Sequence, residues 1–118
     1  MPSFYGIMST VIDLAKWDAA FYSERLLKRS TLEQMWTPAR LNDDKMVLIW
    51  GRHHGLGWFL GDYRGHKVTE YGGSTSTAML RLPEDRLTVI VLTNLDFLAG
   101  SEPHILARGI ADFYLGDL

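Results

Sequence analysis

The sequence has 118 residues, of which 47% are hydrophobic and 22% are charged. These proportions are typical of a folded globular protein, and the length suits a single domain over residues 1–118. The 12 basic and 14 acidic residues give a net charge of −2 and form no long run of one sign, so we expect no nucleic-acid partner.

Cysteine and membrane signals are both absent from the sequence. Without cysteine there are no disulfides, thiolate metal sites or cysteine nucleophiles, but the compartment stays open. The longest apolar run, "LTVIVL", is far shorter than the roughly 20 residues of a membrane helix. The first residues lack the basic start and apolar stretch of a signal peptide, so any export signal is expected outside this sequence. We predict no membrane span and assign no location.

Two helices are predicted between residues 9 and 37. The first begins after Ser9 or Thr10, with Asp13 in its first turn. The second begins at Ser30, which has capping-box spacing to Glu33.

Strands are predicted from residue 46 to residue 95, followed by a helix over 103–115. The strand segments are "MVLIW", "HGLGWFLG", "HKVTEY", "STAMLRL" and "LTVIVLTNL". Hairpin turns are expected at "GDYRGH" and at "PEDR", where Asp85 is expected to bond its own backbone. Short connections imply antiparallel pairing, so the fold class is α+β, an antiparallel sheet flanked by helices. Because "LTVIVL" is apolar on both faces, it needs cover on both sides.

Several familiar motifs are better explained by structural roles. "GGSTS" lacks the last glycine of a nucleophile elbow, and the glycines of "GLGWFLG" have the wrong spacing for a dinucleotide. His53 and His54 are neighbours on a strand and point to opposite faces, so they do not suit one metal ion. His66 and His104 are isolated in the sequence. We predict no metal and no cofactor.

The stretch "YGGSTST" has a chemical use. Gly72 and Gly73 let a substrate approach the backbone closely, and the amides that follow them can point at a developing oxyanion. A polar turn into a strand is the structural alternative, and it is kept for Ser76 and Thr77.

The order of segments resembles the C-terminal part of the serine beta-lactamase-like family, which includes class C beta-lactamases, DD-peptidases and esterases. The resemblance runs from about Gly6 to Leu115. It rests on "GIMSTVIDLAKW", "LLKRSTLEQMWTP", "HGLGWFLGDYRGHKVTEYGGS" and "LPEDRLTVIVLTNL". It implies a partial beta-lactamase or transpeptidase-like fold.

The resemblance also implies site residues. The family's K-T-G type triplet maps onto Tyr71, Gly72 and Gly73, although Tyr71 departs from the usual Lys or His. Ser74 is implied to give its backbone N–H to half of the oxyanion hole. Tyr71 is implied to orient the substrate or assist proton transfer, and the two glycines and Thr75 are implied to bind the substrate.

The family's other two motifs, S-x-x-K and Y-x-N, do not occur in the sequence. An alcohol without a neighbouring base is a poor nucleophile, so we expect the isolated chain to be inactive in acyl transfer. We interpret it as a C-terminal fragment or truncated homologue of a hydrolase that acts, when intact, on a lactam, amide or ester. Its expected macromolecular partner is the missing N-terminal part of the domain or a second copy of the chain.

Two other functions are alternatives. One is a non-catalytic binding or assembly module that pairs through an exposed sheet edge. The other is an unrelated hydrolase that uses Ser74 with His66, which is disfavoured because no acid is evident to orient the histidine.

Overall fold

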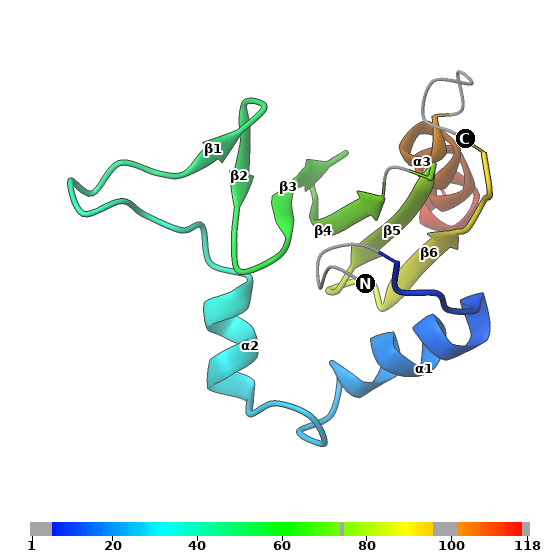
Figure 1. The fold of residues 1–118 in the computed structure, drawn as a ribbon, viewed down its shortest axis with the longest axis horizontal. Helices are drawn as coiled ribbons and strands as arrows, with labels where there is room; N and C mark the ends of the chain where they lie inside the picture. The colour runs from blue at the N-terminus through cyan, green and yellow to red at the C-terminus, as the bar shows by residue number, and fades with distance from the viewer. Residues whose placement is uncertain (1–5, 74, 96–101, 117–118) are drawn as a thin grey trace.

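The computed structural model describes residues 6–73, 75–95 and 102–116, and in these residues a six-stranded antiparallel sheet is accompanied by three helices (Figure 1). The strands lie in the sheet in chain order, from β1 at one edge to β6 at the other. The predicted α+β class and antiparallel sheet are confirmed. The elements are α1 Val11–Ala20, α2 Arg29–Met35, β1 Leu48–Ile49, β2 Arg52–His54, β3 Phe59–Tyr63, β4 His66–Gly73, β5 Thr77–Leu82, β6 Leu87–Val91 and α3 Pro103–Leu115.

The helix starts follow different local rules. Thr10 caps α1, as predicted, and its hydroxyl accepts a hydrogen bond from the amide of Asp13 at 3.1 Å. The capping box predicted at Ser30 is wrong, because α2 begins at Arg29 with Lys28 as its N-cap residue. The carboxylate of Glu24 accepts from the Arg29 amide at 2.9 Å. A side chain from the preceding loop therefore satisfies the first free amide of α2.

Tight turns set the register of the sheet. Arg64 and Gly65 join β3 to β4 with φ of 53° and 83°, as in a two-residue hairpin turn with positive φ at both positions. The predicted hairpin at "GDYRGH" is confirmed. Residues 83–86 join β5 to β6, and the Asp85 amide donates to the Leu82 carbonyl at 3.1 Å, which confirms the second turn.

The segment "HGLGWFLG", expected as one strand, is two strands separated by a turn. The Gly55 amide donates to the Trp58 carbonyl at 2.8 Å, which closes the turn, and the Leu56 amide donates to the Met35 carbonyl at 3.0 Å. A Cβ on Gly55 would lie 2.2 Å from that Met35 carbonyl oxygen. The close approach of the turn to the end of α2 therefore requires glycine and interrupts the strand.

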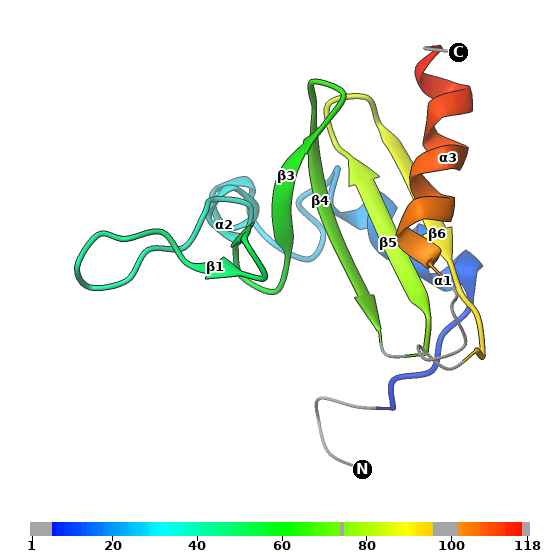
Figure 2. The same cartoon turned by 90° about the horizontal axis from the view of Figure 1, so that it is seen from above.

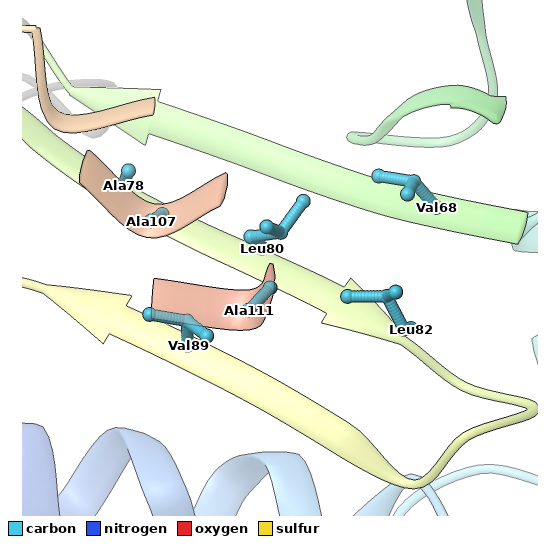
Figure 3. Packing of buried hydrophobic residues seen from close by; sticks show 7 residues of the cluster. All are labelled: Val68, Ala78, Leu80, Leu82, Val89, Ala107 and Ala111. Carbon is cyan, nitrogen blue, oxygen red and sulfur yellow. The ribbon is translucent and has the colours of Figure 1, made fainter. Parts of the chain in front are cut away.

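Helices cover both faces of the strand "LTVIV", as its composition requires (Figures 1 and 2). Helix α3 packs on one face of β5 and β6, and Figure 3 shows Ala107 and Ala111 of the helix over the buried side chains of these strands. The buried residues of this layer are Val68, Ala78, Leu80, Leu82, Val89, Ala107 and Ala111. The opposite face is covered by the α1–α2 region through a second cluster made of Phe21, Leu32, Trp58, Leu60 and Met79.

None of the helices in the described part of the chain has the length and hydropathy of a membrane span.

Candidate functional site

The end of β4 has one open edge. Pairing between β3 and β4 stops at Phe59 and Glu70, while β4 continues through Gly73 and pairs there with β5 alone. Among the described residues, no strand lies against the other edge of Tyr71–Gly73. The amide of Gly73 donates to the Thr77 hydroxyl at 2.9 Å, on the β5 side. Since successive amides of a strand alternate in direction, the amide of Gly72 faces the open edge.

The two predicted glycines make close contacts with the chain itself. A Cβ on Gly72 would lie 2.5 Å from the Thr77 carbonyl oxygen and 2.6 Å from Nε2 of His104. A Cβ on Gly73 would lie 2.7 Å from the Thr77 hydroxyl. Packing within the chain therefore requires glycine at both positions. The predicted role of the two glycines, to leave room for a substrate, is a separate matter and stays a prediction.

Tyr71 belongs to a row of aromatic rings beside the open edge. Its ring stacks on Phe59 with centroids 5.5 Å apart, and Phe59 in turn stacks on Trp50 at 5.7 Å. His54 lies edge-on to both Phe59 and Tyr71. Tyr71 is 46% exposed, so one side of the row is open to a ligand.

A buried carboxylate lies directly before the triplet. Glu70 is 1% exposed and is bonded by three side chains that come from β2 and α3. Arg52 pairs with its Oε1, Arg108 Nη2 lies 2.6 Å from the same oxygen, and His104 Nδ1 lies 3.3 Å from Oε2. Burial alone would raise the pKa of Glu70, but hydrogen bonds from His104 and Arg108 and the arginine charges outweigh it and lower the pKa to about 2. Glu70 is thus ionised at neutral pH and can only accept hydrogen bonds.

Sequence reasoning did not bring these groups together. Glu70 and His104 are 34 positions apart in the chain, and Arg52 approaches from another strand. The available signal was local: His104 and Arg108 have the i, i+4 spacing of one helix face, and an acidic residue immediately precedes the glycine pair.

The loop after β4 is tied to the segment after β6. Ser74, the predicted oxyanion donor, lies outside the described residues. Thr75 is exposed, and its carbonyl accepts from the Thr93 hydroxyl at 3.0 Å. The Ser76 carbonyl accepts from the same hydroxyl at 2.8 Å, and Ser76 is buried with a φ of 55°. The two hydrogen bonds of the Thr93 hydroxyl therefore connect the loop after β4 to the segment after β6.

The other histidines lie away from this edge. His66 is the first residue of β4, seven positions before Gly73, so about 23 Å of strand separates them. Its Nδ1 lies 2.9 Å from the Asp85 carboxylate, so an acid does orient this histidine. Asp85 was expected to bond its own backbone, but its side chain bonds His66. His53 and His54 pair with Leu60 and Phe59 respectively and so face opposite sides of the sheet. In the described ranges, no three His, Cys, Asp or Glu side chains form a group that could hold a metal ion.

A cavity of about 750 Å³ opens between α2 and the sheet. Residues such as Leu32, Trp36 and Leu60 line it, and it includes none of the predicted site residues. Its lining joins members of the second hydrophobic cluster to charged residues such as Glu33 and Lys67.

Comparisons with known proteins show the family of the chain. A family model described as Beta-lactamase matches residues 2–110. Penicillin-binding protein 4* of Bacillus subtilis (strain 168) is 30% identical over 92 residues, which make up 75% of this chain and 19% of that relative. No solved structure gives a significant match. The similarity thus covers most of this chain and a minor part of the relative.

Proposed function

This chain belongs to the beta-lactamase family of serine hydrolases and penicillin-binding proteins, and from that premise we propose that it supplies the carbonyl-binding strand of such a hydrolase. The observation that carries the proposal is the open edge of Tyr71–Gly73, which ends a strand that is paired on its other side. An unpaired strand edge offers backbone hydrogen bonds to an extended ligand. The proposed substrates share a carbonyl group and are lactams, amides or esters.

The proposed reaction is acyl transfer to a serine that lies outside these 118 residues. That serine would attack the carbonyl carbon while backbone amides hold the carbonyl oxygen as it becomes negative. Ser74, which lies outside the described residues, keeps the predicted role of amide donor, and we propose the outward amide of Gly72 as a further donor. Removing one such donor typically costs a hundredfold to a thousandfold in rate. The aromatic row at Tyr71 would pack against the substrate beside Gly73 and Thr75.

Covalent labelling tests the proposal. The 118-residue chain and the product of the complete gene that encodes it are each treated with a fluorescent penicillin and a fluorescent fluorophosphonate. We expect the complete product to be labelled at a serine of an S-x-x-K motif, and the 118-residue chain to remain unlabelled. A complete product that reacts with neither reagent would overturn the hydrolase proposal. A chain labelled at one of its own serines would show that the nucleophile lies within it.

The proposed macromolecular partner is the remainder of the family domain, which would pair with β6. Within the described residues, strand β6 has a partner on one side only, and its residues Leu87–Val91 contain no charge and no proline. Natural sheets normally protect such an edge with charges, proline or a covering segment. A strand covered on both faces by helices is typical of the interior of a sheet.

A second candidate function is a non-catalytic assembly module, and the open β6 edge is the observation that favours it. In that case two copies would pair through β6 and no serine would be acylated. Sedimentation of the complete gene product distinguishes the two functions: a stable dimer that resists both labelling reagents supports the module, whereas a labelled monomer excludes it.

A further inference from the structure

The ring of His104 lies over Gly72, next to the open edge of β4. Its Nε2 lies so close to Gly72 that a Cβ there would be 2.6 Å away. Its Nδ1 lies 3.3 Å from Oε2 of Glu70. Among the described residues, no hydrogen-bond partner contacts Nε2, and the side chain is 38% exposed. The imidazole is therefore held at Nδ1 by Glu70, while Nε2 lies beside the backbone of Gly72 and the side chain as a whole is partly exposed.

The pairing with Glu70 determines which nitrogen carries the proton. A carboxylate that is ionised can only accept, so Nδ1 must donate to it. In the neutral imidazole the lone pair then lies on Nε2, on the side of Gly72. A carboxylate that orients a histidine in this way is the arrangement used by general bases in acyl hydrolysis.

The surroundings hold the pair in place. Arg52 of β2 and Arg108 of α3 both bind Oε1 of Glu70, which leaves Oε2 for the imidazole. Pro103 begins α3 and is buried, so the backbone that carries His104 is anchored against the sheet. The charged groups facing the imidazole are thus one carboxylate and two guanidinium groups.

We propose that the Glu70–His104 pair acts as a general base that hydrolyses small activated esters at the open edge of β4. This activity goes beyond the proposed function because it needs no serine. Nε2 takes a proton from a water molecule as the water oxygen bonds to the ester carbonyl carbon. The electron pair of the carbonyl bond moves to the carbonyl oxygen, which accepts a hydrogen bond from the outward N–H of Gly72. When the tetrahedral intermediate collapses, the bond to the leaving alkoxide breaks and the alkoxide takes the proton from Nε2.

Hydrolysis of p-nitrophenyl acetate by the 118-residue chain tests the proposal. Because general bases contribute about a hundredfold or more, we expect His104→Gln to lower the protein-dependent rate at least about tenfold. His66→Gln is the matched control, since His66 also pairs with a carboxylate but lies at the other end of β4. We expect it to change the rate less than about twofold. An undiminished rate in His104→Gln, or an equal loss in both variants, would overturn the proposal.

Two further measurements separate a general base from other roles. The rate should rise with pH along the titration curve that nuclear magnetic resonance gives for His104, and it should be slower in D₂O. A burst of one equivalent of p-nitrophenol would indicate an acylated imidazole and would contradict the role of general base. The nitrogen shifts of His104 should show a proton on Nδ1 and a lone pair on Nε2, and the opposite tautomer would overturn the proposal whether or not ester is hydrolysed. Neither result depends on the serine labelling that tests the proposed function.

Discussion

Gly72 of β4 lies in contact with both β5 and helix α3. Because a methyl group there would overlap both the Thr77 carbonyl and the His104 ring, Gly72→Ala is expected to lower the free energy of unfolding by about 1–3 kcal/mol. Urea unfolding followed by tryptophan fluorescence measures this loss. Gly61→Ala in β3 is the control, since a Cβ on Gly61 meets nothing within 4 Å. Equal losses in the two variants would contradict the packing explanation.

Glu70 should make stability depend on acid pH. Its pKa in the folded chain is about 2, below the ordinary value of 4.5, so its contribution is fully present above pH 4.5 and is lost as the pH falls toward 2. The shift corresponds to about 3 kcal/mol. Urea unfolding between pH 6 and pH 2.5 should therefore show a fall in stability that is smaller in Glu70→Gln. A parallel fall in the variant would assign the acid sensitivity to other carboxylates.

Helix α1 is attached to the sheet by a buried ion pair inside an aromatic box. Arg81 of β5 is fully buried and pairs through Nε with Asp18 of α1. Its guanidinium lies 4.6 Å from the centre of the Phe21 ring and 5.0 Å from that of Trp36. Such rings stabilise a desolvated cation through their negative faces. The arginine therefore contributes to the hydrophobic layer as well as to the ion pair.

Arg81→Met is expected to cost about 3 kcal/mol, because it leaves the Asp18 carboxylate without its partner. The double variant Asp18→Asn/Arg81→Met removes both charges and should recover part of this loss. Chemical unfolding of the wild type, both single variants and the double variant gives the coupling energy of the pair. Additive losses would show that the ion pair does not anchor α1.

Local patterns predicted the elements better than the contacts between them. Thr10 and the turn at Arg64 and Gly65 depend on neighbouring residues, so the sequence alone was enough for both. The start of α2 was misplaced because the carboxylate that binds its first amide comes from Glu24, outside the capping-box pattern. The triplet Tyr71–Gly73 is contiguous and was assigned from its resemblance to the K-T-G type motif of the family, so its role stays a prediction. The Glu70–His104 pair was missed because only the packing of α3 on the sheet brings the two residues together.

In the part of the chain that the structure describes, β6 forms an edge of the sheet with no strand on its outer side. In the isolated chain we expect this edge to pair with a second copy, giving concentration-dependent association in sedimentation velocity. Val91→Lys places a charge at the end of β6 and should shift the chain toward monomer. Leu48→Lys makes the same change at an exposed position of the short opposite edge strand and should have little effect. Loss of association in both variants would indicate nonspecific apolar contact instead of strand pairing.

The point at which β3 departs from β4 sets the length of the open strand edge. Only three residues, Tyr71–Gly73, extend past the last pair between these strands, which corresponds to about 10 Å of extended chain. A ligand that forms hydrogen bonds with the backbone of this edge has room for two or three residue-sized groups before it reaches the turn at Trp58. If the proposed function is correct, this short edge favours compact acyl groups over long polymers that would extend along the sheet.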